Sequence, residues 1–538
     1  MNCENQILEA AINGGKRMKI LKKLSVCALA FALMLTGCSS KKNVVTQTKQ
    51  DKARTVITTD GEVDDMNSVI RALLYSNDID ISGIVLTSSM YHYAGDKEKG
   101  IEPFRWTGTD WIYKFIDDYG KVYDNLKAHD KDYPTPESLK SITKIGNITN
   151  KGEMEKETEG SKFLEKLFLD DDDRKLYVQT WGGTNTTARA LKSIEEKYKG
   201  TDDWKKIQKK INDKLVLYII LDQDDSYGDY IAKKWSGIEV INDRSNFWHF
   251  AYVWQMHNDE LNDTLKADWC YENLVKDKGP LMANYALMGD GKIIEGEDYK
   301  ELRGTEDYLK NNPNYKKYDF ISEGDSPSFF YLLDTGLRSI EDPSYGGWGG
   351  RFGTGKNAPY ENTVLDYNPY TKQYEAQYSL SRWFTDIQND FAARVDWCLT
   401  DDDSKVNHAP SVSVKEGIDV TAKAGETVTL TAAGKDKDDD KLSYKWWRYH
   451  EADTYQDSKV TTKEKVDSFS GLQIDIKRKL GKNEKTNSIK IKNANKKQMS
   501  FIVPKDAKKG DTIHMIVEVQ DDGAHQLKHY QRVIITVK

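Results

Sequence analysis

Short apolar runs rich in β-branched residues alternate with amphipathic stretches through the larger, N-terminal part of the chain. The strand candidates, which have the composition of strands buried on both faces, are 54–59, 79–87, 175–180, 214–221 and 237–241. Helical segments at 161–168 and 187–198 separate several of them, and an amphipathic stretch at 381–397 closes the region. This alternation predicts an α/β domain over 53–405, with a mostly parallel sheet and helices on both faces.

The pattern changes after a polar hinge at 401–410. Short alternating strands follow, separated by Gly, Asp and Lys turns, at 427–431, 442–447, 498–503, 512–519 and 531–537. Regular spacing of this kind predicts a smaller all-β, immunoglobulin-like sandwich over 406–538. Its acidic run Asp436–Asp440 would either hold Ca²⁺ or form a solvated turn. The absence of EF-hand spacing favours the turn.

The N-terminal region has the features of an export signal. Lysines precede a short apolar run that ends in Leu-Thr-Gly before Cys38, so residues 18–37 are predicted to be a signal peptide. The ending resembles a bacterial lipobox, which implies cleavage before Cys38 and lipid on its sulfur. The exported chain would then be anchored to a bacterial membrane. Residues 38–52 are predicted to be a linker, and residues 1–17 to be an extension upstream of the true start at Met18.

Composition narrows the classes of function. The chain has 538 residues and a formal net charge of −7, and it lacks the basic character of a nucleic-acid-binding surface. Its 13 Trp and 30 Tyr residues include candidates for stacking on sugars, although most aromatic residues belong to cores. After processing, Cys270 and Cys398 would be the cysteines other than Cys38. They would form one bridge or remain two buried thiols, too few for a disulfide-rich scaffold or a four-ligand zinc site.

Four acidic side chains, which are candidate metal ligands, stand close together in Asp60-Gly-Glu-Val-Asp-Asp65. This stretch directly follows the first strand candidate and precedes a helical segment. Like charges this close raise one another's pKa unless a cation lies among them. A strand-to-helix turn of a parallel sheet is also where ligands bind, outside the carboxyl ends of the strands. The pattern therefore predicts a site for a hard cation, Ca²⁺ rather than Mg²⁺. The alternative is a helix N-terminus whose acids suit the helix dipole.

Two later motifs give this cluster a family resemblance. The strand candidate Leu176–Thr180 leads into Trp181-Gly-Gly-Thr-Asn185, and Glu323-Gly-Asp-Ser-Pro-Ser328 follows much later. With the acidic turn, these motifs resemble the nucleoside hydrolases. The whole chain more closely resembles a bacterial cellulose-binding family that has a nucleoside-hydrolase-like domain followed by an immunoglobulin-like one. The segments that carry the closer match are 61–68, 222–225, 323–328, 346–351 and 390–394.

This resemblance implies a metal-assisted catalytic centre. It implies that Asp60, Asp65 and Asp325 bind Ca²⁺ through their carboxylates and that Thr180 binds it through its backbone carbonyl. It further implies that Asp60 is the general base toward water and that Asp64 hydrogen-bonds a sugar hydroxyl. The implied reaction is hydrolysis of a glycosyl bond, N-glycosyl in the superfamily.

Several positions depart from the nucleoside-hydrolase pattern. The first Asp of the motif is Thr58, and a small residue is replaced by Glu62. Ser89 falls near the position at which the family has an Asn that grips the sugar, so this substrate contact is expected to be weakened or changed. No His precedes Asp325, because Gly324 stands there. In nucleoside hydrolases a His at this position can help a purine leave. The residues implied for metal binding are thus present, whereas the His implied for assisting a purine leaving group is absent. This difference favours a leaving group other than a purine, such as a sugar.

Other residues are weaker candidates. Asn246 and Trp248 lie at a suitable distance along the chain for a sugar-binding segment. His92 follows the second strand candidate and would either protonate a leaving group or pack in a loop. The acidic segment Asp222–Asp225 would either reach the site or cap the next helix. The tryptophans that would stack on a sugar or else lie in the core are Trp181, Trp248 and Trp348.

Functions of different classes remain open from the sequence. The preferred one is a calcium-dependent hydrolase of glycosyl bonds at the bacterial cell surface, because binding alone does not require a base such as Asp60. The alternative is a non-catalytic surface protein that binds cellulose or another plant polysaccharide, which the missing leaving-group residues favour. A third and weaker candidate function is the scavenging of nucleosides at the membrane. The expected ligand is a carbohydrate or nucleoside, and membrane contact is expected through the lipid anchor only.

Overall fold

The computed structural model describes residues 52–294, 303–455, 465–469, 472–479 and 488–538 of the chain. The predicted extension, signal peptide and lipidation site, and all of the predicted linker except Lys52, lie outside this part. No helix in the described ranges combines the length and the apolar character needed to cross a membrane.

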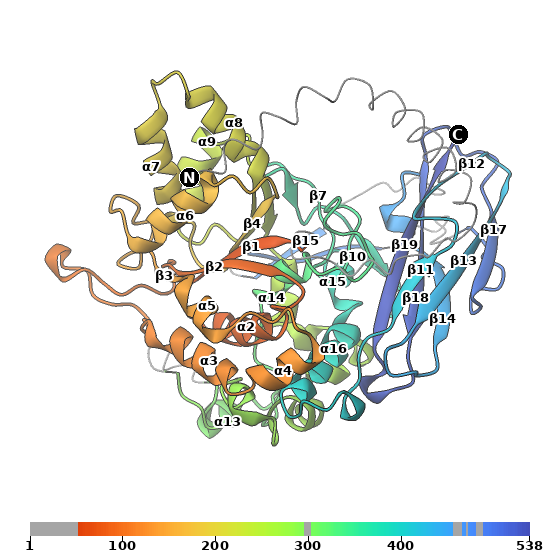
Figure 1. The fold of residues 1–538 in the computed structure, drawn as a ribbon, viewed down its shortest axis with the longest axis horizontal. Coiled ribbons are helices and arrows are strands. Elements are labelled where there is room, and N and C mark those ends of the chain that lie inside the picture. The colour runs from red at the N-terminus through yellow and green to blue at the C-terminus, as the bar shows by residue number, and fades with distance from the viewer. Residues whose placement is uncertain (1–51, 295–302, 456–464, 470–471, 480–487) are drawn as a thin grey trace, which may run out of the picture. The chain divides into compact units, whose positions relative to one another are not determined.

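An eight-stranded sheet organises the N-terminal region (Figure 1). Its strands are β1 (Arg54–Thr59), β2 (Asp80–Leu86), β3 (Thr143–Ile145), β4 (Leu176–Thr180), β5 (Leu215–Ile220), β6 (Glu239–Asp243), β7 (Gly353–Thr354) and β8 (Tyr360–Glu361). The order is β3-β2-β1-β4-β5-β6-β8-β7, and only β7 and β8 pair antiparallel. The five predicted strands are confirmed close to their predicted bounds. The other three are too short to give a periodic signal.

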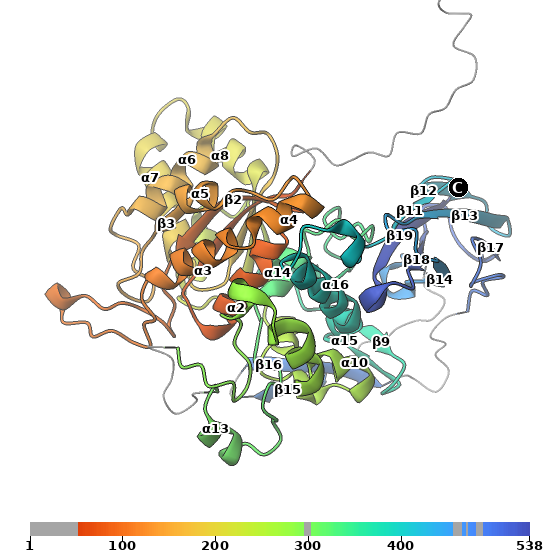
Figure 2. The same ribbon diagram turned by 60° about the horizontal axis from the view of Figure 1, so that its bottom comes forward.

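Helices cover both faces of this sheet, as predicted (Figures 1 and 2). One face packs against α2 (Val63–Leu74), α3 (Asp110–Gly120), α4 (Tyr123–His129), α5 (Pro136–Ser141), α14 (Ser326–Phe330) and α16 (Phe384–Trp397). The other packs against α6 (Glu159–Leu169), α7 (Asn185–Tyr198), α8 (Trp204–Lys214) and α9 (Ala232–Lys234). In β1, Ile57 and its neighbour Val56 join opposite cores, because successive strand residues point to opposite faces.

Short helices fill the connections of the N-terminal region. They are α10 (Asp259–Asn262), α11 (Ala267–Cys270), α12 (Gly279–Met282), α13 (Glu306–Asn311) and α15 (Tyr378–Ser381). The three predicted helical stretches correspond to α6, α7 and α16, so the pattern of the sequence is confirmed for the long helices.

The C-terminal region is a β-sandwich, as the period-two pattern predicts. Its strands are β11 (Ser411–Val414), β12 (Asp419–Ala422), β13 (Thr427–Lys435), β14 (Ser443–Arg448), β17 (Gln498–Ile502), β18 (Thr512–Gln520) and β19 (Lys528–Val537). They form a three-stranded sheet, β11-β13-β17, and a four-stranded sheet, β12-β19-β18-β14. In β13, buried Val428 and Leu430 alternate with the exposed Thr427 and Thr429. This alternation gives the sandwich a core of its own.

Contacts also join the two predicted domains. A third sheet contains β9 (Asp366–Asn368) and β10 (Gln373–Glu375) from the first, and β15 (Lys465–Phe469) and β16 (Leu472–Lys479) from the second. The β19 residue Arg532 donates to the carbonyls of Leu337, Tyr345 and Gly346. Tyr530, also of β19, packs in the core of the α/β region. One hydrophobic core therefore crosses the predicted boundary at residue 406.

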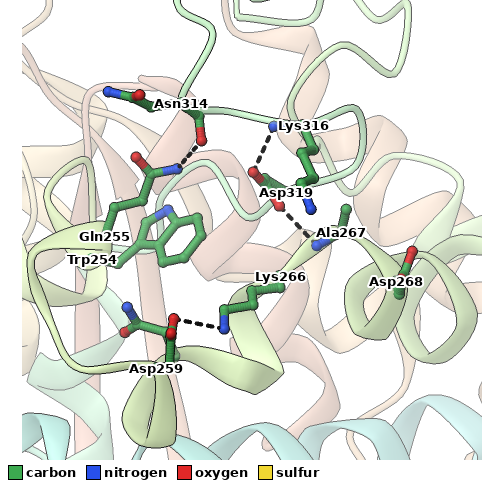
Figure 3. Close-up of a pocket in the computed structure, with 10 residues that line it drawn as sticks. Trp254, Gln255, Asp259, Lys266, Ala267, Asp268, Asn314, Lys316 and Asp319 are labelled. Atoms are coloured by element: carbon green, nitrogen blue, oxygen red, sulfur yellow. Dashed lines mark hydrogen bonds and ion pairs between the residues drawn. The ribbon is translucent and has the colours of Figure 1, made fainter.

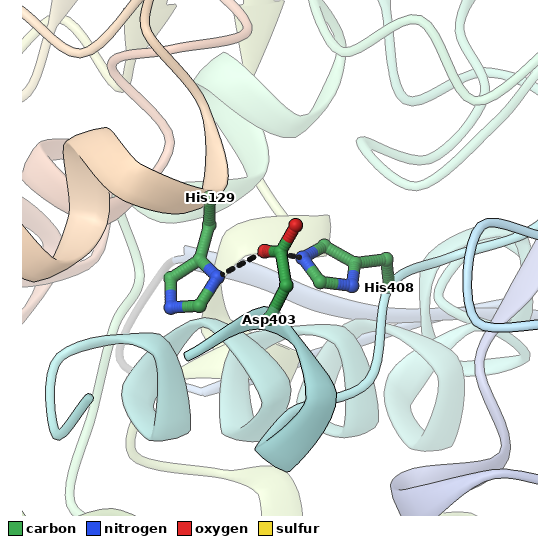
Figure 4. Close-up of side chains that lie close together, drawn as sticks. All are labelled: His129, Asp403 and His408. Carbon is green, nitrogen blue, oxygen red and sulfur yellow. Dashed lines mark hydrogen bonds and ion pairs between the residues drawn. The ribbon is translucent and has the colours of Figure 1, made fainter. Parts of the chain in front are cut away.

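The hinge (401–410) is fixed by an imidazole–carboxylate cluster (Figure 4). Asp403 Oδ1 lies 2.7 Å from His129 Nδ1 of α4 and 3.3 Å from His408 Nε2. His129 Nε2 contacts the carbonyl of Thr400 at 2.7 Å, and His408 Nδ1 lies 2.9 Å from Asp438 of the sandwich. The polar groups of this cluster thus satisfy one another.

Cys270 and Cys398 are both buried, and neither forms a disulfide in the described part of the chain. The Sγ of Cys270 lies 3.7 Å from the carbonyl of Thr264, and that of Cys398 lies 3.6 Å from the carbonyl of Arg394. Of the two alternatives left by the sequence, the structure has two buried thiols.

Candidate functional site

The acidic turn lies at the carboxyl end of β1, in the middle of the parallel strands. Asp60 follows the strand, and α2 begins at Val63 with Asp64 and Asp65 in its first turn. Thr180 ends the neighbouring strand β4, in register with Thr58 of β1. The turn therefore occupies the sheet edge at which open α/β folds bind ligands.

Four buried carboxyl groups meet at this edge. Asp64, Asp65 and Asp325 each place a carboxylate oxygen within 4.8 Å of the others. Asp325 directly precedes α14, so it comes from a distant part of the chain. The carboxyl group of Asp60 is close enough to those of Asp65 and Asp325 for their charges to interact, and its backbone amide donates to Asp65 Oδ1 at 3.2 Å. The structure thus brings together the carboxylates assigned to the metal, and it adds Asp64 to the same cluster.

Hydroxyl groups donate to Asp64 and Asp65, whereas three other carboxylate oxygens of the cluster have no donor among the described residues. In the described part of the chain, neither carboxylate oxygen of Asp60 has a donor, and Asp325 Oδ2 also has none. Burial raises the pKa of Asp60, Asp65 and Asp325, and the neighbouring carboxylates raise the last two further. Buried anionic oxygens without partners are costly. This oxygen-only donor set has the composition that hard divalent cations prefer.

The Trp-Gly-Gly turn after β4 touches Asp60. A Cβ on Gly182 would lie 2.8 Å from Asp60 Cβ and 3.1 Å from its Oδ2, so only glycine allows this approach. A Cβ on Gly183 would lie 2.3 Å from Asp224 Oδ2, which accepts from the Asn185 amide at the start of α7. Asp222 accepts from two amides of the helical turn that follows it. These two carboxylates of the Asp222–Asp225 segment therefore cap helices.

Glu62 and His92 adjoin the acidic cluster. His92 Nδ1 lies 3.9 Å from Asp60 Oδ2 and 3.7 Å from Glu62 Oε2, and the His92 side chain is fully buried. Glu62 also accepts from the Tyr252 hydroxyl at 3.1 Å and lies 3.5 Å from Arg105 Nη2. The sequence placed Glu62 in the acidic turn and marked it as a departure from a family pattern, without assigning it a role. The structure places it between the buried acids and the partly exposed Tyr252.

Ser89 shapes the turn that carries His92. Its hydroxyl accepts from the amides of Tyr91 at 2.9 Å and His92 at 3.3 Å, and its own amide donates to the His92 carbonyl. Ser89 is fully buried. Its contacts therefore position His92 beside Asp60.

The segment after β6 contributes an aromatic wall. A Cβ on Gly324 would lie 3.1 Å from Asp64 Oδ2 and 3.3 Å from the Phe247 ring, so Phe247 borders the acids. Trp248 is partly exposed, and its ring centroid lies 4.7 Å from that of Phe247. Asn246 instead donates to Ser379 Oγ at 3.3 Å. The sequence identified Trp248 and missed Phe247, whose contact depends on the tertiary fold.

The other two tryptophan candidates belong to the core. Trp181 is 1% exposed, and its indole N–H donates to Ser328 Oγ at 2.8 Å. Trp348 is 3% exposed and packs in the same core. Of the three, Trp248 alone keeps a partly exposed ring in the described structure.

A polar pocket of about 470 Å³ lies outside the acidic cluster (Figure 3). It is lined by Trp254, Gln255, Asp259, Asn262, Lys266, Ala267, Asp268, Asn314, Lys316 and Asp319. Lys266 pairs with Asp259 at 2.9 Å, and Asp319 accepts from the amides of Ala267 and Lys316. Several charged groups of the pocket therefore already have partners within it. The pocket is not lined by Asp60, Asp64, Asp65 or Asp325.

Comparisons with known proteins agree with the motifs. A family model described as "Cellulose-binding Sde182, nucleoside hydrolase-like domain" matches residues 54–352. A second, "Cellulose-binding protein Sde0182, C-terminal domain", matches residues 427–537. No curated protein matches the chain.

One solved structure aligns over most of the chain. It is a nucleoside hydrolase-related protein from Saccharophagus degradans that is associated with carbohydrate metabolism, and it is 26% identical with a TM-score of 0.65. The alignment covers 90% of this chain and 100% of that protein.

Two further structures match at lower similarity. A plant nucleoside hydrolase is 11% identical with a TM-score of 0.26, covering 53% of this chain and 80% of its own. The effector XopQ, complexed with adenosine diphosphate ribose, is 10% identical with a TM-score of 0.30, and the match covers 58% of this chain and 87% of that protein. These scores are too low to support an argument. Since the first family model spans more than half of the chain, the protein belongs to the cellulose-binding Sde182 family with a nucleoside-hydrolase-like domain.

Proposed function

We propose that this protein hydrolyses glycosyl bonds with the aid of Ca²⁺ bound at the acidic turn. The observation that carries the proposal is the convergence of Asp60, Asp64, Asp65 and Asp325, in which both oxygens of Asp60 and Oδ2 of Asp325 have no donor among the described residues. Favourable interaction with the helix dipole does not explain this arrangement, because Asp325 comes from a different element.

The residues that would hold Ca²⁺ are Asp60, Asp65 and Asp325 through their carboxylates and Thr180 through its backbone carbonyl. Asp64 is close enough to Asp65 and Asp325 to join them. When bound, the ion would supply positive charge that favours formation of a nucleophile from water at neutral pH.

Residues of the chain supply the remaining chemistry. Asp60 would accept a proton from the attacking water, since no described donor occupies its oxygens. We assign proton delivery to His92 and Glu62, which adjoin Asp60 and lie outside the ligand set. Trp248 would stack on the sugar through its partly exposed ring.

A carbohydrate is the proposed substrate. Gly324 stands where a nucleoside hydrolase has the His that helps a purine leave, and His92 with Glu62 would instead protonate a sugar oxygen. The cellulose-binding name of the family and the association of its solved relative with carbohydrate metabolism support this choice. We therefore propose O-glycosyl bonds of plant-wall oligosaccharides as substrates.

A second candidate function is carbohydrate binding without turnover. One observation favours it: Glu323, which directly precedes the position of the missing His, is fully buried and paired with Arg71. This pairing makes Glu323 unavailable as a proton donor. The two candidates differ in whether Asp60 acts as a base.

The test combines metal binding with turnover. Calorimetric titration of Ca²⁺ into the metal-stripped protein would be compared between the wild type, Asp65→Ala and Asp319→Asn, a buried carboxyl outside the cluster. We expect Asp65→Ala alone to lose a site. Nucleosides and plant-wall oligosaccharides would then be screened with Asp60→Ala as the inactive control. Calcium binding without turnover of any substrate would favour the binding function. A wild type with no calcium site at the cluster would overturn the catalytic proposal.

We further propose that the chain is exported and anchored through lipid on Cys38. The supporting feature is the apolar run that ends in Leu-Thr-Gly before this residue. Expression of the wild type and Cys38→Ser in a bacterial host with labelled fatty acid tests the proposal. We expect label and membrane association in the wild type alone. Equal membrane association of both chains would contradict it.

A further inference from the structure

Two loops of the sandwich meet beside the hinge. The β13–β14 loop and the β18–β19 loop are neighbours, because Ser443 at the start of β14 pairs with Gln520 at the end of β18. The Lys441 amide of the first loop donates to Asp522 Oδ1 of the second at 2.8 Å. The hinge residue Asn407 donates to the carbonyl of Ala524 in the second loop at 2.6 Å.

Acidic side chains from both loops gather at this junction. Asp436, Asp438 and Asp440 each place a carboxylate oxygen within 4.8 Å of the others. Asp438 interacts with His408. Its Oδ2 accepts from the His408 amide at 2.7 Å, and its Oδ1 lies 2.9 Å from His408 Nδ1. Asp521 enters from the second loop, near enough to Asp436 for the two charges to interact.

Hydrogen bonds fix these side chains while leaving one oxygen of each without a donor. Asp521 is 4% exposed, and its Oδ1 accepts from the amides of Gly523 and Leu527, whereas its Oδ2 has no donor. Asn407 is 5% exposed, and its Nδ2 donates to Asp521 Oδ1, whereas its Oδ1 has no donor. Among the described residues, Asp521 Oδ2 and Asn407 Oδ1 therefore both lack a donor.

Asp436 follows the same pattern. Its Oδ1 accepts from the amides of Asp438 and Asp440 at 2.8 Å and 3.1 Å, which folds the loop around it. Its Oδ2 is buried without a donor among the described residues. A solvated turn would expose such an oxygen to water, so the burial argues against that alternative.

Gly523 brings the second loop against Asp440 of the first loop and Asn407 of the hinge. A Cβ on Gly523 would lie 2.1 Å from Asp440 Oδ2 and 2.7 Å from Asn407 Nδ2, so the loop and the hinge converge there. Burial, with a smaller contribution from the charge of Asp436, raises the pKa of Asp521 to about 6. Negative charge thus accumulates in a place with little access to water.

We propose that Asp436, Asp440, Asp521 and the amide oxygen of Asn407 form a second divalent-cation site, with Ca²⁺ as its ligand. All four contribute oxygen, which hard cations prefer, and the irregular loops suit the flexible coordination of Ca²⁺ better than the strict octahedron of Mg²⁺. The ion would join the hinge to both loops and so stabilise the junction between the domains. This site is independent of the proposed hydrolysis.

Calcium titration of the full chain tests the site. The background is Asp65→Asn, which removes the cluster at β1, and the test variant adds Asp521→Asn. The matched control adds Asp439→Asn, because Asp439 is exposed in the same loop with a φ of 63° that Asn tolerates. We expect one calcium equivalent to persist in the background and in the control, and to disappear in the test variant. Persistence in the test variant, or none in the background, would overturn the proposal.

Thermal unfolding separates loss of the site from loss of folding. In EDTA, Asp521→Asn should unfold at the same or a higher temperature than the wild type, because it removes a repelling charge. Added Ca²⁺ should raise the unfolding temperature of the wild type and of Asp439→Asn, but not that of Asp521→Asn. Asp436→Asn is the second test variant if Asp521→Asn fails to fold, and an undiminished calcium response there would contradict the site. Failure of the cluster at β1 would appear separately, as an Asp65→Asn chain that binds as much calcium as the wild type.

Discussion

Arg71 of α2 and Glu323, in the loop before α14, form an ion pair in which both side chains are fully buried. Arg71 Nη2 lies 2.8 Å from Glu323 Oε1, and the hydroxyls of Tyr285 and Ser326 also donate to this carboxylate. The pair joins the helix that carries Asp64 and Asp65 to the loop that carries Asp325. It therefore holds together the two segments whose acids form the cluster.

Removing one partner of this pair should damage the fold. Glu323→Ala would leave the Arg71 charge buried and unpaired, which we expect to lower the free energy of unfolding by about 3–5 kcal/mol. Urea unfolding of the metal-free protein measures the loss. The exposed pair of Lys209 and Asp213 provides the control, because Asp213→Ala should cost less than about 1 kcal/mol. Similar losses in the two variants would contradict the role of the buried pair.

The long elements of the fold could be predicted from local pattern. In β1 every side chain is buried, and in β13 burial alternates, so the sequence carries the period of each strand. Strands of two or three residues, such as β7 and β8, carry no period. The pairing of β10 with β16 depends on contacts between distant segments, and no local pattern encodes it.

The candidate site was predictable only where motifs are compact. Asp60, Asp64 and Asp65 stand together in the sequence, and the motif around Asp325 linked it to them through the family resemblance. Phe247 reaches the cluster through tertiary packing against Gly324, which the sequence does not reveal. The signal that could have identified Glu62 was its charge at a position where the family has a small residue.

The close approach of Gly182 to Asp60 predicts a selective loss of function. Gly182→Ala would place a Cβ 2.8 Å from Asp60 Cβ, so the carboxylate must move. A displacement of about 1 Å in a catalytic group can lower the rate on the order of 10²-fold. We expect this loss of turnover, together with weaker calcium binding, in a folded protein. Steady-state kinetics and calorimetry measure the two effects.

The neighbouring glycine gives the contrasting result. A Cβ on Gly183 would lie 2.4 Å from the backbone carbonyl oxygen of Ser88, which cannot swing away as a side chain can. Gly183→Ala should therefore lower the free energy of unfolding by about 1–3 kcal/mol. Urea unfolding of the two variants separates the effects. A Gly182→Ala protein with wild-type turnover would show that Asp60 need not hold its position.

His514 predicts a loss of stability in acid. It is 1% exposed, and its Nδ1 accepts from Arg532 Nη1 at 3.0 Å. Burial and the Arg532 charge lower the pKa of His514 to about 2. Above pH of about 6.5 the imidazole is neutral in both states. Below this pH the His514 imidazole is protonated in the unfolded chain but stays neutral in the folded chain. The free energy of unfolding should therefore fall by about 1.4 kcal/mol per pH unit.

The variant His514→Gln isolates this contribution. Glutamine keeps a hydrogen-bond acceptor for Arg532 but does not titrate, so its unfolding free energy should lose this part of the pH dependence between pH 7 and 5. Urea midpoints of the wild type and the variant, compared at pH 8 and pH 5, measure the difference. Parallel pH profiles for the two chains would mean that His514 accepts a proton in the folded state.

The positions of His92 and Glu62 predict a dependence on the leaving group. If His92 delivers the proton, His92→Gln should lower kcat by about 10²–10⁴-fold for oligosaccharides, whose leaving alkoxide needs protonation. Dinitrophenyl glycosides, whose leaving group needs no proton, should lose little. Glu62→Gln, measured on both substrate classes, indicates which of the two groups transfers the proton. Equal losses on both classes in His92→Gln would instead assign His92 to positioning Asp60, from which it lies 3.9 Å away.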